Sequence, residues 1–167
     1  MAIPESQLEI WSHQGAITTS KDTYATVKRA LESENAAYAK RQFEVFLQGS
    51  YANDTNIYSE SDVDIVICYT GEFYHNLEKL TSEQRGLFSA VFPNGTYAYD
   101  TFKTSVQSAL VAAFGSSVQS GKKAFRIGAS GARRSADVVS AFDHRRYTGF
   151  NSLQDEKYYG GISFLHL

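Results

Sequence analysis

Apolar residues along this chain fall into short runs separated by Gly, Asp, Ser and Asn, a pattern typical of strands. We expect strands over five runs: Phe43–Leu47, Val63–Tyr69, Lys122–Ile127, Ala136–Phe142 and Gly161–Leu167. The polar segment Tyr147–Gly160 is expected to be a loop.

Three longer segments repeat apolar residues at helical spacing instead, and we expect helices over residues 20–40, 82–92 and 97–114. The residues expected to point inward are Leu87, Ala90 and Val91 in the second helix and Tyr99, Phe102, Val106 and Leu110 in the third. Together these elements predict one α+β domain over residues 1–167, with a mixed sheet and helices packed on one face.

Two aspartates, Asp62 and Asp64, flank the start of the Val63–Tyr69 run. Side chains alternate along a strand, so both carboxylates lie on one face while Val63 and Ile65 point into the core from the other. Neighbouring carboxylates repel each other, and a hard cation such as Mg²⁺ or Mn²⁺ relieves that repulsion. The alternative is a strand edge made soluble by two aspartates, which does not require the second acid.

A Gly-Ser turn follows the Phe43–Leu47 run. Gly49 lets the backbone approach a ligand closely, and Ser50 adds a hydroxyl and a backbone N–H. A helical start after Ser50 would favour a phosphate at its N-terminus. The chain therefore has a candidate triphosphate site close in sequence to a candidate metal site.

These motifs resemble a known family of enzymes. The order Leu-Gln-Gly-Ser-Tyr-Ala at residues 47–52, followed by Ser-Asp-Val-Asp-Ile-Val at residues 61–66, resembles the nucleotidyltransferases of the polymerase-β superfamily. It looks more specifically like the cyclic GMP-AMP synthase-like enzymes of bacterial anti-phage defence, which make cyclic di- or trinucleotides. The resemblance covers nearly the whole chain and implies a polymerase-β-like core. It also implies nucleoside triphosphate substrates, bound through Gln48, Gly49 and Ser50.

Two-metal phosphoryl transfer commonly uses a third carboxylate, on a strand beside the first two. Asp137 is the best candidate, because its apolar flanks indicate a central strand on which an acid needs a partner. The resemblance points to the same residue, with Ser140 where the family often has proline. Asp143 is the rival, but His144, Arg145 and Arg146 follow it and favour an ion pair at a strand end.

Basic residues gather between residues 122 and 146, a stretch with a net charge of +5 in a chain whose formal net charge is −2. This distribution suits a small polyanion better than a nucleic acid duplex. Lys123 is expected to meet a phosphate, since it shares a strand face with Phe125 and Ile127. The alternative for Lys122 and Lys123 is a solvated strand edge guarded by lysines.

The single cysteine, Cys68, excludes an intramolecular disulfide and is expected to be a small buried side chain. The sequence has no signal-peptide pattern and no apolar run long enough to span a membrane, so a cytosolic setting is expected.

The resemblance therefore implies a metal-dependent nucleotidyltransferase that makes a cyclic di- or trinucleotide, with Asp62, Asp64 and Asp137 as its catalytic and metal-binding acids. The resemblance also implies a helical second domain, absent from these 167 residues, that closes the cleft. Two alternatives stay open. One is transfer of a single nucleotide to a protein, an RNA end or a small molecule. The other is a non-catalytic nucleotide-binding module completed by a partner chain.

Overall fold

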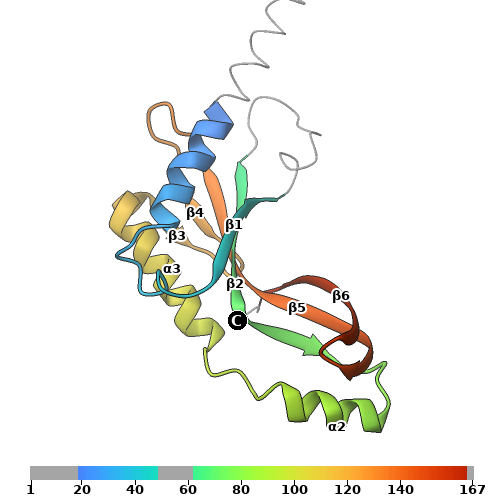
Figure 1. Cartoon of the computed structure of the whole chain (residues 1–167). Coiled ribbons are helices and arrows are strands. Elements are labelled where there is room, and N and C mark those ends of the chain that lie inside the picture. Colours follow the sequence, from blue (N-terminus) through green and yellow to red (C-terminus); the bar gives the residue numbers. More distant parts are fainter. Residues whose placement is uncertain (1–18, 49–61, 165–167) are drawn as a thin grey trace, which may run out of the picture.

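The strands pair into one mixed sheet, seen in a computed structural model that describes residues 19–48 and 62–164 (Figure 1). The sheet order is β1-β2-β5-β4-β3, and β6 pairs with β5 beyond this path. The strands are β1 (Phe43–Leu47), β2 (Val63–Asn76), β3 (Val118–Ser120), β4 (Phe125–Ile127), β5 (Ala136–Ser152) and β6 (Asp155–Ser163). The helices are residues 19–31, α2 (Ser82–Val91), α3 (Tyr99–Phe114) and the 3-10 turn η2 (Gly115–Ser117).

The long strands β2 and β5 run parallel at the centre of this sheet, from the pair Val63 and Ala136 to the pair Asn76 and Arg146. Strand β1 pairs antiparallel with β2, whereas β4 and β6 pair antiparallel with β5. The expected α+β class with a mixed sheet is confirmed, as is the central place of the strand that carries Asp137.

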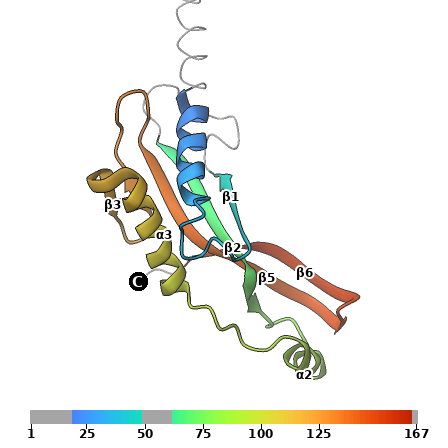
Figure 2. The ribbon, with the colours of Figure 1, turned by 60° about the vertical axis from the view of Figure 1, so that its left-hand side comes forward.

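The main core lies between the sheet and two helices, the one of residues 19–31 and α3, which Figure 2 shows on the same side of the sheet. Alternate residues of β2 and β5 face these helices and are almost completely buried, as predicted for Val63, Ile65 and Ile67. The inward face of α3 also agrees with the prediction: Tyr99, Phe102, Val106 and Leu110. Burying each such side chain stabilises the fold by about 1.5 to 3 kcal/mol.

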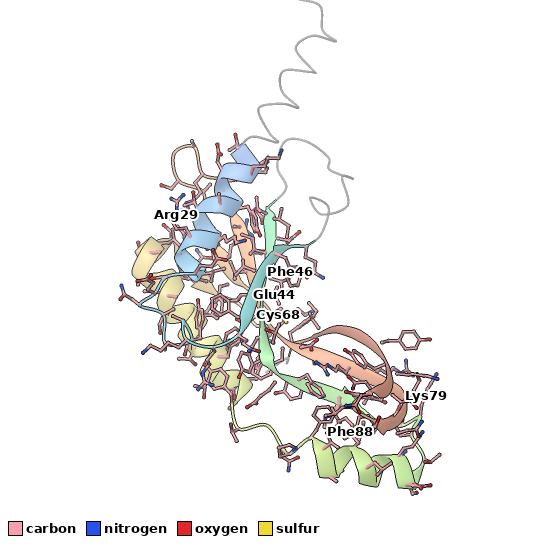
Figure 3. The ribbon with its side chains drawn as sticks, in the orientation of Figure 1. Arg29, Glu44, Phe46, Cys68, Lys79 and Phe88 are labelled. Atoms are coloured by element: carbon pink, nitrogen blue, oxygen red, sulfur yellow. The ribbon has the colours of Figure 1, made fainter. Side chains whose placement is uncertain are left out.

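A second, smaller core joins α2 to the far ends of β2 and β5. Its buried members are Leu80, Phe88, Tyr147 and Phe150. The inward face expected for α2 was wrong, because Phe88 is only 2% exposed while Leu87 is 42% and Val91 is 39% exposed. Figure 3 shows Phe88 pointing from α2 toward the strands.

Two element boundaries also differ from the prediction. The first helix ends at residue 31 rather than near 40. At this end the Tyr38 hydroxyl donates a hydrogen bond of 2.8 Å to the Leu31 carbonyl, which would otherwise lack a partner within the helix. The expected loop Tyr147–Gly160 is instead a hairpin of β5 and β6. Strand β6 is held by main-chain hydrogen bonds to β5, and its side chains are mostly exposed. It therefore lacks the alternation of apolar and polar residues from which a strand is predicted.

The strands around the site also differ in length from those expected. Strand β4 covers only Phe125–Ile127, and β2 continues past Tyr69 to Asn76. The short strand β3 was not predicted. No helix among the described residues is long and apolar enough to cross a membrane.

Candidate active site

Asp64 and Asp137 lie directly opposite each other on the neighbouring parallel strands β2 and β5. The pairs before and after them, Val63 with Ala136 and Ile65 with Val138, are fully buried toward the helices. Alternation therefore turns both carboxylates to the other face of the sheet. The expectation that Asp137 stands on the strand beside Asp64 is confirmed.

Asp62 precedes β2 and has two partners of its own. The Ser135 hydroxyl donates to Asp62 Oδ1, and Nη2 of Arg126 lies 3.1 Å from Asp62 Oδ2. Strand pairing places these partners, because the backbone N–H of Val63 donates to the Ser135 carbonyl at 3.0 Å. Asp62 is thus anchored at the same end of the sheet as Asp64 and Asp137.

The electrostatics of the opposed pair are unfavourable for two ionised carboxylates. Burial raises the pKa of Asp64 above its usual value, and the charges of Asp137 and then Asp62 raise it further. Burial also raises the pKa of Asp137, followed by the charge of Asp62, while Arg126 opposes the shift. An added cation at this place would lower both pKa values.

Within the described residues, no group of three or more His, Cys, Asp or Glu side chains is gathered closely enough to hold a metal ion. Asp62 pairs with Arg126 and Ser135, whereas Asp64 and Asp137 oppose each other. The strands bring the three acids to one end of one sheet face, but the three side chains do not converge on a common metal position.

Arg126 is the neighbour of these acids that sequence reasoning missed. It stands between the buried residues Phe125 and Ile127 on β4, and its backbone lies opposite Asp137. The same alternation that identifies Asp64 would have placed it on the acid face, had the short strand β4 been bounded correctly. In the sequence it is one of the basic residues between 122 and 146.

The residues expected to contact the nucleotide differ in where they lie relative to the acids. The backbone N–H of Gln48 donates to the Asp64 carbonyl at 2.9 Å, so Gln48 continues β1 alongside the acid. Gly49 and Ser50 lie outside the described residues. Lys123 is exposed and precedes β4, and Phe125 and Ile127, whose face it was expected to share, point into the core and away from the acids.

The rival acid Asp143 has a different environment. It lies opposite Phe73 rather than another carboxylate, and its Oδ2 is 3.4 Å from Nε of Arg145, which confirms the expected ion pair. The guanidinium of Arg145 also stacks over Phe73, 4.0 Å from the ring centre. Asp143 is in the middle of β5, not at a strand end as expected.

An apolar patch continues along the acid face of the sheet. Val66, Cys68 and Ala141 are buried there, with Phe46, Val139 and Ile162 packed against them. Figure 3 shows Phe46, Glu44 and Cys68 close together over β1 and β2. Burial, followed by the charges of Asp143 and Glu44, raises the pKa of the Cys68 thiol to about 12, and its place in this patch confirms the expected small buried side chain.

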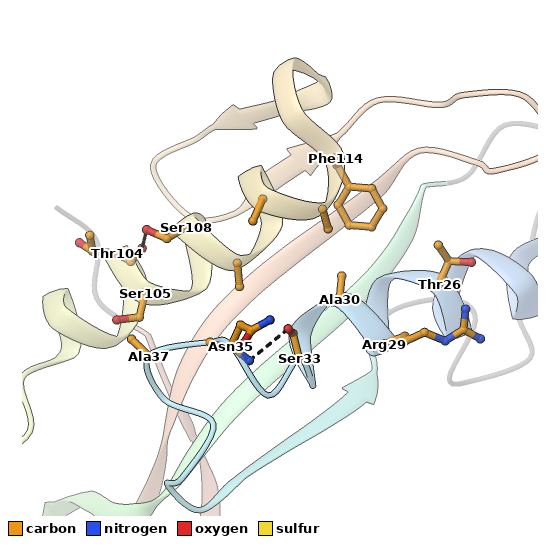
Figure 4. Close-up of a pocket in the computed structure, with 14 residues that line it drawn as sticks. Thr26, Arg29, Ala30, Ser33, Asn35, Ala37, Thr104, Ser105, Ser108 and Phe114 are labelled. Atoms are coloured by element: carbon orange, nitrogen blue, oxygen red, sulfur yellow. Dashed lines mark hydrogen bonds between the residues drawn. The ribbon is translucent and has the colours of Figure 1, made fainter.

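Two cavities of the described part lie away from the acids. One, of about 700 Å³, separates the helix of residues 19–31 from α3 and is lined largely by Ala, Ser and Thr (Figure 4). The other, of about 900 Å³, lies between the far part of β2 and the segment joining α2 to α3. None of the three aspartates lines either cavity.

The comparison with known proteins points in one direction. No family model matches the chain. It is 38% identical to the cyclic nucleotide synthase CdnE01 of Staphylococcus haemolyticus over 98% of its own length and 55% of that protein. It is 39% identical to the cyclic UMP-AMP synthase of Rhodothermus marinus, over 98% of its own length and 54% of the relative.

Solved structures agree with the sequence comparison. The R. marinus CdnE c-UMP-AMP synthase, determined with Apcpp and Upnpp, matches with a TM-score of 0.75 over 99% of this chain and 53% of that one, at 38% identity. The Elizabethkingia meningoseptica CdnE cyclic dinucleotide synthase, determined with GTP and Apcpp, matches with a TM-score of 0.57 at 30% identity, over 99% of this chain and 52% of that one. The chain spans about half the length of the relatives it matches.

Proposed function

The chain is a homologue of the CdnE cyclic nucleotide synthases, and from that premise we propose that it carries the catalytic acids of a nucleotidyltransferase that makes a cyclic di- or trinucleotide. The observation that supports this function best is the register that sets Asp64 against Asp137, with Asp62 at the same end of the sheet. Two opposed carboxylates on parallel strands cost stability and contribute nothing to the core, which favours a role in chemistry.

Asp62, Asp64 and Asp137 are the residues that would hold Mg²⁺ or Mn²⁺. Their donor atoms are all carboxylate oxygens, which these hard cations prefer. Burial, and after it neighbouring negative charge, raises the pKa values of Asp64 and Asp137, and a bound cation would offset the repulsion between the carboxylates. When bound, such an ion supplies charge neutralisation at phosphate oxygens and lowers the pKa of a coordinated hydroxyl.

The chain's own residues then position the substrates. Gln48, Gly49 and Ser50 hold the triphosphate of the donor nucleotide, whereas Lys123 is left out of the proposed site because the strand face it was expected to share points into the core. A ribose hydroxyl of the acceptor nucleotide attacks the α-phosphorus in line, a P–O bond forms, and pyrophosphate leaves. Asp137 is the carboxylate that we propose assists removal of the hydroxyl proton.

The proposed protein is a cytoplasmic enzyme of anti-phage signalling, with nucleoside triphosphates as substrates. Residues 1–167 are its nucleotidyltransferase domain, and a C-terminal helical domain or a partner chain supplies the opposite wall of the cleft. The share of the relatives that this chain spans supports that division, because about half of each relative has no counterpart here.

Incubation with all four labelled nucleoside triphosphates and Mg²⁺ or Mn²⁺, followed by phosphatase treatment and product separation, tests the proposal. The matched variants are Asp64→Asn at the proposed site and Asp143→Asn on the same sheet, where the acid pairs with Arg145. A phosphatase-resistant product that is lost only in the first variant supports cyclic nucleotide synthesis. A product that persists at the same rate in Asp64→Asn contradicts it.

The same experiment separates the alternatives. Transfer of a single nucleotide gives a labelled protein, RNA end or small molecule instead of a cyclic product. Metal-dependent nucleotide binding without pyrophosphate release indicates a non-catalytic module. Repeating the assay with a version that continues past Leu167 shows whether a further domain restores turnover.

A further inference from the structure

Asp62 differs from the other two candidate metal ligands because it already has a cationic partner. Nη2 of Arg126 lies 3.1 Å from Asp62 Oδ2 and 3.5 Å from Oδ1, and the Ser135 hydroxyl donates to Oδ1. Asp64 faces Asp137 across the strands and has no ion pair among the described residues. Of the three acids, the one that could complete a metal site is therefore held by an arginine.

The backbone of Arg126 cannot move away from the acids. Strand β4 pairs with β5 on one side, where Arg126 lies opposite Asp137, and with β3 on the other, where it lies opposite Gln119. The buried rings and branches of Phe125 and Ile127 anchor the strand on the core face. The strand pairing therefore fixes the backbone of Arg126 beside the acid face, within reach of the acids.

The guanidinium itself is free to change partner. The side chain of Arg126 is 57% exposed and that of Asp62 is 24% exposed. Solvent therefore screens their ion pair, and the attraction between the two charges is weak. A divalent cation carries twice the charge of the guanidinium and binds two or three carboxylates at once. It should therefore displace the arginine from Asp62.

We propose that Arg126 is an internal counter-ion for Asp62. Its guanidinium occupies the Asp62 carboxylate until a divalent cation displaces it. This competition sets the metal concentration at which Asp62, Asp64 and Asp137 come together around the cation. This inference rests on the proposed metal-dependent function. It makes Arg126 a positioning residue that acts through Asp62.

Direct Mn²⁺ binding, measured by titration calorimetry and by the loss of the free-Mn²⁺ signal in electron paramagnetic resonance, tests this without relying on turnover. Arg126→Gln should bind Mn²⁺ about two- to fivefold more tightly than the parent chain, since the competing charge is gone. Arg126→Lys keeps the charge and should stay close to the parent. Lys122→Gln removes the same charge from the exposed turn before β4 and should have no effect.

A double-mutant cycle with Asp62→Asn shows whether Arg126 acts through Asp62. The gain from Arg126→Gln should largely disappear when Asp62 is already neutral. Equal Mn²⁺ affinities of Arg126→Gln and the parent chain, with unchanged circular dichroism, would overturn the inference. Failure of the proposed metal site has a different signature: Asp62→Asn and Asp64→Asn would then leave Mn²⁺ binding unaltered.

Discussion

The paired strands β2 and β5 carry two regions of opposite character. At the acid end, Asp64 lies against Asp137, and both acids have pKa values raised by burial and by neighbouring negative charge. At the far end, the same two strands meet α2 around an aromatic cluster, where Phe88 packs 5.0 Å from Tyr147 and 5.4 Å from Phe150 between ring centres. The acid end holds carboxylates that repel each other, whereas the far end holds aromatic side chains that pack favourably.

The difference shows how a sheet can keep an unfavourable charge arrangement in place. The pairs on either side of the two aspartates are fully buried, so the register cannot slip without exposing the core. The acids are held by packing on the opposite face rather than by contacts of their own. Activity and stability should therefore respond to different substitutions along the same pair of strands.

The largest expected effect is on turnover. Asp137→Asn should reduce nucleotidyl transfer by about 10² to 10⁴-fold, because it removes a metal ligand and a proton acceptor together. Initial rates of pyrophosphate release measure this, in whichever version of the chain is active.

Asp143→Asn is the matched control, six positions along the same strand. It breaks the ion pair with Arg145 but touches no residue of the proposed site, so its rate should stay near that of the parent. An equal loss of pyrophosphate release in Asp137→Asn and Asp143→Asn would contradict a specific role for the acid end of the strands.

The largest expected effect on stability lies at the far end. Phe88→Ala should lower the free energy of unfolding by about 3 to 5 kcal/mol, because it empties the centre of the aromatic cluster. Denaturant unfolding followed by circular dichroism measures it. Leu87→Ala, on the exposed side of the same helix, should change stability by less than about 0.5 kcal/mol. A loss of the same size in both variants would show that the helix rather than the cluster is responsible.

Asp64→Asn should stabilise the folded chain at pH 7 and raise its melting temperature by about 2 to 4 °C, measured in EDTA. The folded-state pKa of Asp64 is raised, so the parent loses stability as pH rises from the usual aspartate pKa through the folded value. The advantage of the variant should be complete above that window and vanish below it. Asp143→Asn, which removes a favourable ion pair, should instead lower the melting temperature slightly.

The smallest effect is expected at Ser140, which lies between the two regions on β5. Its hydroxyl is buried and has no hydrogen-bond partner in the described part of the chain. Ser140→Ala should therefore change the free energy of unfolding by less than about 0.5 kcal/mol, or increase it. Tyr99→Phe is the comparison: it removes the 2.9 Å bond that the Tyr99 hydroxyl donates to the Ser140 carbonyl, and should cost about 1 kcal/mol.

Much of the fold and of the acid pair was predictable because alternation and helical spacing are local properties. The strand Phe43–Leu47, the buried face of Val63, Ile65 and Ile67, and the inward residues of α3 agree with the pattern. The hairpin of β5 and β6 was missed because an edge strand is held by its main chain and needs no apolar face. Phe88 was overlooked because Leu87 and Val91 fit the helical period equally well.

The sequence by itself determined that Asp62, Asp64 and Asp137 stand beside apolar strands, and that Asp64 and Asp137 turn away from the core, because the direction of a side chain follows from its parity along a strand. Only the tertiary structure decided that Asp64 meets Asp137 on one rung, that Asp143 meets Phe73 instead, and that Arg126 reaches Asp62 across 64 positions of sequence. Register and strand order are long-range properties, set by how the buried faces fit together, and no local pattern contains them.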